Sequence, residues 1–115
     1  MTVLKHHVGL TPERWSQFSI LMQLGNVSAD VGRMIKWRNS GNHVQSENAF
    51  ERALELMYLT IIDPKNKKRL RELLLAREAI KDYFVCGGEE LGTTGEWLDN
   101  YFFQFAYAAA LERGR

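Results

Sequence analysis

The sequence contains a single cysteine, Cys86, among its 115 residues, so no internal disulfide can form. No histidine or basic residue stands beside Cys86, and the sequence therefore gives no support to a nucleophilic thiol. Long apolar runs are missing too, since none approaches the ~20 residues that a membrane-spanning helix needs. A chain with one cysteine and no such run fits a reducing compartment, and we expect a cytoplasmic protein without a membrane partner.

Net charge is nearly absent, because 15 basic residues face 14 acidic ones and leave a formal charge of +1. The whole molecule therefore has no strong field to steer it onto nucleic acid or lipid, and only local patches can argue for such partners. Repeats and low-complexity stretches are also missing. We expect one domain over residues 1–115, with 1–10 as a flexible lead-in that lacks the apolar core of a secretion signal.

The sequence does contain clear signals for where helices begin. Thr11 and Asp63 each precede a proline, Asn42 follows Gly41, and Thr93 opens a capping-box pattern, so each marks the start of a helix. Apolar residues between these signals recur at helical spacing. The pattern predicts four helices, over 12–39, 43–62, 64–85 and 94–112. Their short links predict an all-α fold, an antiparallel up-down-up-down four-helix bundle.

Small residues collect on one side of the first predicted helix: Gly25, Ser28, Ala29 and Gly32. Each glycine lowers helix propensity by about 1 kcal/mol, so a glycine inside a helix needs a structural explanation. Close approach of a second helix is one such reason, and a kink is the alternative.

Arg38 and His43 flank the glycine turn between the first two predicted helices. A histidine can act as general acid or base near neutral pH, and an arginine can hold a phosphate, so the pair could cleave RNA. The alternative is that both are ordinary helix-end residues, since a cation suits the last turn of a helix.

The segment from Arg38 to His43, with the sequence RNSGNH, resembles the ribonuclease motif of HEPN-like domains. The helix, Gly/Asn turn and helix over residues 15–62 are similar to the opening of those helical bundles. In that family the motif usually lies on a later helix. The resemblance implies a ribonuclease or toxin-type domain with Arg38 and His43 as catalytic residues, and a nucleotidyltransferase as partner.

Arg77 falls near the middle of the apolar arc of the third predicted helix. A buried guanidinium needs a partner, because an unpaired buried charge is very costly. We consider Asp30, Glu112 or a ligand anion as that partner, which would make a polar pocket inside the bundle. A side chain that reaches out to solvent, or a charge pair across a dimer, would also satisfy it.

A basic run begins the third predicted helix, with the cations Lys65, Lys67, Lys68, Arg69 and Arg71. The N-terminal end of a helix disfavours cations, so the run could instead serve to bind phosphate or an RNA backbone. The alternative is a solvated face that pairs with acids of the preceding helix, which are Glu47, Glu51 and Glu55.

Aromatic residues crowd the last predicted helix and circle too far around it to share one core. We expect Phe103 and Tyr107, together with Trp97, to form an exposed patch that binds a second copy or another protein. The alternative is that the N-terminal segment, through Val3, Leu4 and Val8, folds over this patch.

The residues show no motif that identifies a reaction. Metal ligands are poorly grouped, and no glycine loop could cradle a phosphate, so we expect no metal and no cofactor. The interpretation that these patterns favour is a small helical protein that acts by self-association or as a partner of another protein, and is not itself catalytic. A HEPN-like ribonuclease and an RNA- or phosphate-binding accessory are the two alternatives.

Overall fold

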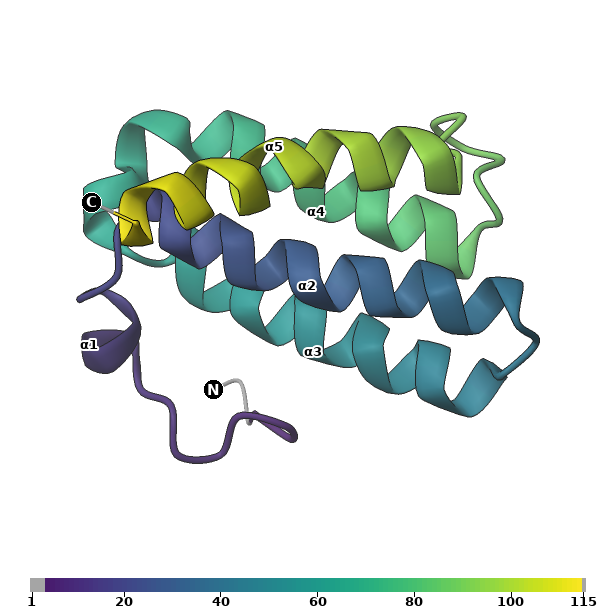
Figure 1. The fold of residues 1–115 in the computed structure, drawn as a ribbon, viewed down its shortest axis with the longest axis horizontal. Coiled ribbons are helices and arrows are strands. Elements are labelled where there is room, and N and C mark those ends of the chain that lie inside the picture. Colours follow the sequence, from purple (N-terminus) through teal and green to yellow (C-terminus); the bar gives the residue numbers. More distant parts are fainter. Residues whose placement is uncertain (1–3, 115) are drawn as a thin grey trace.

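The structure is a computed structural model that describes residues 4–114, and in that range every regular element is a helix. The all-α class is therefore confirmed. Four long helices are joined by short links and accompanied by two short helical pieces (Figure 1). In chain order the elements are α1 (Pro12–Trp15), α2 (Ile20–Asn39), α3 (His43–Ile61), the 3-10 helix η1 (Pro64–Arg69), α4 (Leu70–Val85) and α5 (Gly95–Arg113).

The first predicted helix, over 12–39, is wrong as one continuous element. α1 ends at Trp15, and α2 begins at Ile20 with Ser19 as its N-cap, whose hydroxyl accepts a hydrogen bond from the Met22 amide. Serine side chains compete for backbone groups and favour such breaks. The break lets Trp15 turn inward, where its indole nitrogen donates to the buried Thr60 hydroxyl at 2.9 Å.

Three of the predicted helix starts use the expected caps. The side chains of Thr11 and Asn42 accept hydrogen bonds from backbone amides in the first turns of α1 and α3. The last helix is capped by Thr94, one residue after the Thr93 that the capping-box pattern marked. Gly41 has φ +82°, a left-handed conformation that a residue with a side chain rarely adopts. Asp63 caps the third predicted helix as expected, but the segment 64–85 is not uniform, since its first turns form η1 and only the rest is α-helical.

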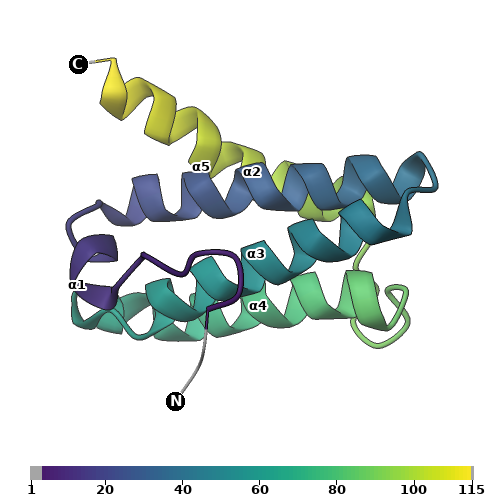
Figure 2. The same cartoon turned by 90° about the horizontal axis from the view of Figure 1, so that it is seen from below.

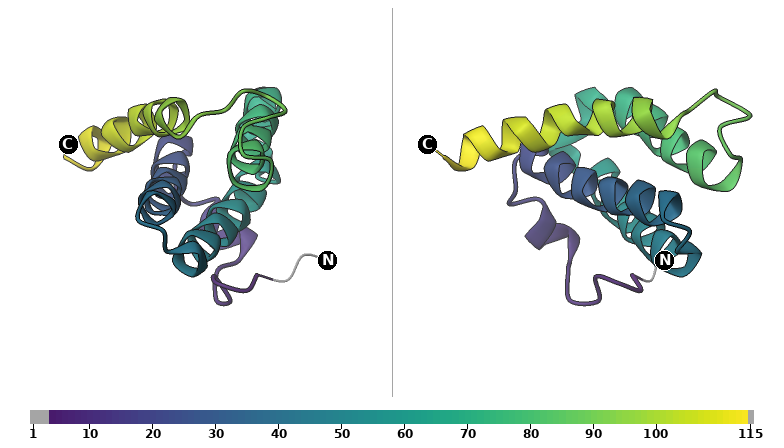
Figure 3. Two further views of the ribbon diagram at one scale, coloured as in Figure 1. Left: turned by 90° about the vertical axis from the view of Figure 1, so that its right-hand side faces the viewer. Right: turned by 45° about the vertical axis from the view of Figure 1, so that its right-hand side comes forward.

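α2 is the central helix of the fold. It packs against α3 on one side and α5 on the other, whereas α4 packs on α3 and barely touches α5. Seen end-on, α2 lies next to both α3 and α5 (Figure 3). α5 crosses α2 at an angle, and its C-terminal end stands away from the other helices (Figure 2).

The crossing of α2 and α5 explains one glycine of the small-residue side. A Cβ on Gly25 would lie 2.9 Å from the Ala109 Cβ and 3.5 Å from the Phe105 carbonyl oxygen. Of the two explanations for the glycines in this helix, close packing of a second helix therefore applies to Gly25. A Cβ on Gly32 would meet nothing nearer than an Asp99 oxygen at 4.0 Å, so Gly32 has no such role.

The core joins all the long helices, and its fully buried large side chains include Leu24, Met34, Met57, Leu73, Ile80, Leu98 and Phe102. A buried polar group closes the end where α1 and η1 meet. There the Gln23 amide nitrogen donates to the Trp15 carbonyl and to Asp63, each at 2.9 Å. Asn66 in turn donates to the Gln23 side-chain oxygen at 2.8 Å. Each buried side-chain nitrogen or oxygen of this group has a hydrogen-bond partner, as buried polar atoms in folded proteins usually do.

Candidate functional site

A hollow of about 500 Å³ opens between the first half of α4 and the first half of α5. It exists because α4 and α5 make little direct contact. Its lining combines cations, one acid, aromatic rings and aliphatic side chains, and consists of Lys68, Arg69, Arg71, Glu72, Leu75, Ala76, Trp97 and Tyr101. We call it the α4–α5 hollow. Here part of the basic run and two aromatic residues of the last helix come together.

Aromatic rings form one wall of the α4–α5 hollow. The rings of Trp97 and Tyr101 stack with centroids 5.4 Å apart and planes only 7° from parallel. The Tyr101 hydroxyl donates to the Glu72 carboxylate at 3.2 Å, which fixes the ring against α4. Burial and the nearby charge of Glu72 raise the pKa of Tyr101 to about 12, so the hydroxyl keeps its proton and remains a donor.

Cations form the opposite rim of the hollow. The Arg69 guanidinium nitrogen Nη1 lies 4.0 Å from the Glu72 carboxylate oxygen Oε1, at the limit of an ion pair. Lys68 and Arg71 are exposed and form no ion pair within residues 4–114. Three cations against one carboxylate give this rim a local positive charge that the net charge of the chain does not reveal.

The predicted basic run does not form one surface. Lys65 turns away to pair with the buried Asp63 and to donate to the Ser16 carbonyl oxygen at 3.1 Å. Lys67 is exposed but does not line the hollow. The structure therefore divides the run, and only Lys68, Arg69 and Arg71 meet the aromatic wall.

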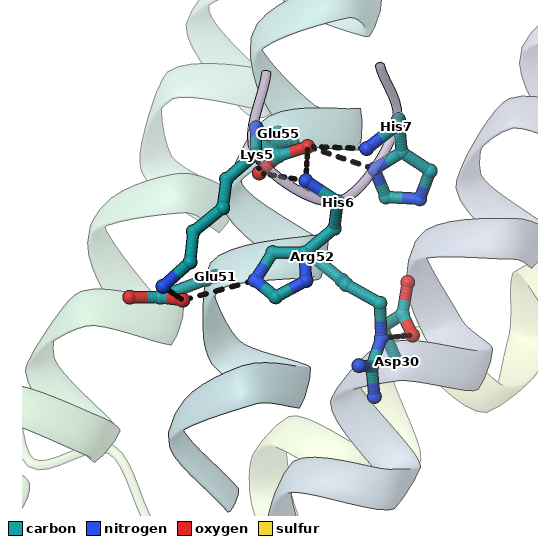
Figure 4. A network of polar contacts seen from close by, with 7 residues as sticks. All are labelled: Lys5, His6, His7, Asp30, Glu51, Arg52 and Glu55. Atoms are coloured by element: carbon teal, nitrogen blue, oxygen red, sulfur yellow. Dashed lines mark hydrogen bonds and ion pairs between the residues drawn. The ribbon is translucent and has the colours of Figure 1, made fainter. Parts of the chain in front are cut away.

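Within residues 4–114 no ion pair joins the acids of α3 to the basic run, so that alternative is wrong. Glu55 instead accepts hydrogen bonds from the backbone amides of Lys5, His6 and His7, at 3.0 to 3.1 Å (Figure 4). Glu51 accepts from the Lys5 ammonium and the His6 ring. Burial raises the pKa of Glu55, but these donors outweigh it and hold the pKa below its ordinary value. The described part of the lead-in is thus attached to α3.

The turn between α2 and α3 gives Arg38 a structural role. Its guanidinium donates to the Tyr83 carbonyl oxygen at 2.7 Å and lies 4.8 Å from the centroid of the Tyr83 ring. A cation at the last carbonyls of α4 also suits the helix dipole. The His43 ring stacks on Phe84 with centroids 5.8 Å apart, and Arg38 lies 5.8 Å from the same ring. The two predicted residues therefore share a neighbour, but the arginine is already occupied by protein carbonyls.

Arg77 is only partly buried, so it does not support the polar pocket that was one of the interpretations left open by the sequence. Its side chain is 39% exposed and lies 3.3 Å from the carboxylate of the adjacent Glu78. The candidate partner Asp30 pairs instead with Arg33 at 2.9 Å and Arg52 at 3.1 Å. The side chain of Arg77 reaches solvent at the edge of the apolar arc, which is the alternative that the sequence left open.

α5 carries a second apolar face. Phe103, Tyr107 and Leu111 are 62%, 58% and 52% exposed, and at 100° per residue they lie opposite the buried Phe102 and Phe105. We call these three residues the outer stripe of α5. Phe103 and Tyr107 are exposed as expected, but Trp97, which is 52% exposed, lies beside the hollow and does not share their patch.

The N-terminal segment does not cover the outer stripe, and that alternative is wrong for the residues that the structure describes. Leu4 packs against the core, the segment at His6 and His7 is bonded to α3, and Val8 is 81% exposed. Val3 lies outside the described residues.

The described residues give little support to metal binding or to thiol chemistry. Among residues 4–114 no three histidine, cysteine or carboxylate side chains are grouped as metal ligands would be. Burial, with the charges of Glu90 and Asp82, raises the pKa of the Cys86 thiol, the opposite of what a nucleophile needs. No helix in the described range is both long and apolar enough to cross a bilayer.

Comparison of the chain with known protein families, with curated proteins and with solved structures finds no match. The α4–α5 hollow and the outer stripe are therefore interpreted from their own chemistry. The hollow was not predictable from the sequence because its aromatic residues lie about thirty positions after the basic run. Trp97 and Tyr101 are four residues apart, so they lie on one side of the helix. This spacing was the signal in the sequence that both rings could face an antiparallel neighbouring helix.

Proposed function

We propose that the protein works by association and that two copies pair through the outer stripe of α5. The observation that carries the proposal is that α5 has apolar side chains on both faces, and only one face meets the core. A helix with a second apolar face needs a second cover, and phenylalanine and tyrosine are enriched in such interfaces.

The spacing of the outer stripe supports a second copy of the chain as its partner. Residues 103, 107 and 111 are spaced by four, so the stripe can pack against itself when two α5 helices run antiparallel.

The proposal includes the arrangement of the four main helices as an up-down-up-down bundle. The links support it, because residues 40–42 and 62–63 leave room only for tight reversals between neighbouring helices. In such a bundle the outer stripe lies on the far side of α5 from α2 and is available to a partner.

The test is sedimentation of the purified chain. We expect twice the 13.3 kDa mass of one chain, and a return to the single mass in a Phe103→Asp, Tyr107→Ser variant. The control is Val44→Asp, which places a charge at a residue that is 67% exposed on α3, away from the stripe. A single-chain mass for the unaltered protein, or an unchanged mass in the double variant, would contradict the proposal.

A HEPN-like ribonuclease with a nucleotidyltransferase partner is the alternative that the turn at Arg38 and His43 would support. The hydrogen bond from Arg38 to the Tyr83 carbonyl weighs against it, because that guanidinium would have to leave α4 to bind a phosphate. RNA cleavage that is lost in both Arg38→Ala and His43→Ala, with folding intact, would replace our proposal with this one.

A further inference from the structure

We infer that the α4–α5 hollow is a binding site for a nucleotide, with the base against the aromatic wall and the phosphates at the cationic rim. The site is separate from the outer stripe and from the turn at Arg38 and His43. Its three components are the volume, the stacked rings and the group of cations in its lining.

The aromatic wall suits a nucleobase. Trp97 and Tyr101 are nearly parallel and both line the hollow, and Trp97 is 52% exposed, so a flat ring in the hollow can pack against them. The hydrogen bond to Glu72 fixes Tyr101 before any ligand arrives. Stacking of a base on an aromatic side chain contributes about 1–3 kcal/mol and accepts any base, because every base has a π face.

The cationic rim suits phosphate. Lys68 and Arg69 lie in the last turn of η1 and Arg71 in the first turn of α4, so the three cations gather where the two elements join. An anion bound there would be stabilised by charge-assisted hydrogen bonds to these cations. Leu75 and Ala76 provide the apolar floor between the rim and the rings.

The size of the hollow matches this occupant. Its volume of about 500 Å³ lies within the range of about 300–1,000 Å³ that is usual for small-molecule sites. A simple anion would leave the rings unused, and an uncharged apolar ligand would leave the cations unused. A nucleotide uses both, either as a free molecule or as one unit of a single strand.

The experiment measures the affinity of ADP by calorimetry and that of a fluorescent single-stranded adenosine decanucleotide by anisotropy. Binding of ADP assigns the free nucleotide, and binding of the decanucleotide alone assigns a single strand. We expect Trp97→Ala and Arg71→Glu each to weaken binding about tenfold or more, since they remove the stacking surface and reverse a phosphate contact.

The controls are matched to these variants. Lys67→Glu changes the same charge in the same basic run, outside the hollow, and Phe103→Ala removes an exposed aromatic ring from the same helix. Both should leave the affinity within about twofold. No saturable binding of either probe at low salt would overturn the inference, as would equal losses for Lys67→Glu and Arg71→Glu. Phe103→Ala also separates this site from the proposed dimer.

Discussion

Gly25 and Gly32 stand on the same helix, but only one of them is enclosed. An added Cβ would lie 2.9 Å from the Ala109 Cβ at Gly25, and at Gly32 its nearest neighbour is 4.0 Å away. Both alanine variants gain helix propensity, whereas overpacking affects only Gly25→Ala. We expect the free energy of unfolding of Gly25→Ala to fall below that of Gly32→Ala by about 1–3 kcal/mol in urea denaturation. Recovery in a Gly25→Ala, Ala109→Gly variant would show that the contact is the cause.

Asp82 holds the loop between α4 and α5 by accepting the backbone amides of Glu90, Leu91 and Thr93 at 3.0 to 3.1 Å. Burial raises the pKa of the Asp82 carboxyl, but these hydrogen bonds outweigh burial and lower it below 3.8. A lowered folded-state pKa means that the carboxylate stabilises the fold fully above pH 3.8 and loses this effect as the pH falls through the folded-state value.

We therefore expect Asp82→Asn to lower the melting temperature at neutral pH and to flatten its decline in acid. Thermal unfolding followed by circular dichroism across the acid range measures both effects. Glu47→Gln is the control, because Glu47 is an exposed carboxylate without a hydrogen bond from the described residues. An acid decline in Asp82→Asn as steep as in the unaltered protein would contradict this role.

At the scale of elements, the attachment of the N-terminal segment to α3 depends on one carboxylate. Glu55 receives three consecutive backbone amides, and hydrogen bonds to a charged acceptor contribute about 1.5–3 kcal/mol each. We expect Glu55→Gln to reduce the exchange protection of the Lys5, His6 and His7 amides by about tenfold or more. Hydrogen exchange measured by NMR tests this, and unchanged protection would exclude Glu55 as the anchor. Lowering the pH through the folded-state pKa of Glu55, which lies below its ordinary value of 4.5, should act in the same direction.

Element boundaries were predictable where a local signal decides them. Asn42 and Thr94 cap helices that sequence patterns placed within one or two residues. The break after Trp15 was missed because tertiary burial of its ring outweighs the helical periodicity around it. The attachment of the lead-in to α3 was also missed. Glu55 binds backbone amides, so the attached segment needs no particular side chains and shows no sequence pattern.

At the scale of the whole molecule, a dimer links stability to concentration. If two chains pair through the outer stripe, folding is favoured by mass action, and the melting temperature should rise with protein concentration. The Phe103→Asp, Tyr107→Ser variant should show no such rise. Scanning calorimetry over a hundredfold range of concentration measures both, and a flat response in the unaltered protein would agree only with a monomer.

The candidate sites were predictable only in part at this scale. The exposed faces of Phe103 and Tyr107 follow from helical spacing, because a helix cannot bury side chains on opposite sides in one core. The α4–α5 hollow could not be derived, since it depends on how far two helices separate. Arg77 was misplaced for a related reason: the angular position of a long side chain does not fix whether its end reaches solvent.

The unequal packing of the long helices has a consequence for local unfolding. α2 is covered by α3 and α5, whereas α4 has only α3 as an extensive neighbour. The segment from η1 through α4 is therefore expected to open as a unit before the rest of the fold, and its amides should exchange earlier than those of α2. Proteases should make their first cut in this segment or in the loop that follows it. Since η1 and α4 supply the cationic rim of the hollow, a bound nucleotide should delay that cut, which makes proteolysis rate an independent measure of occupancy.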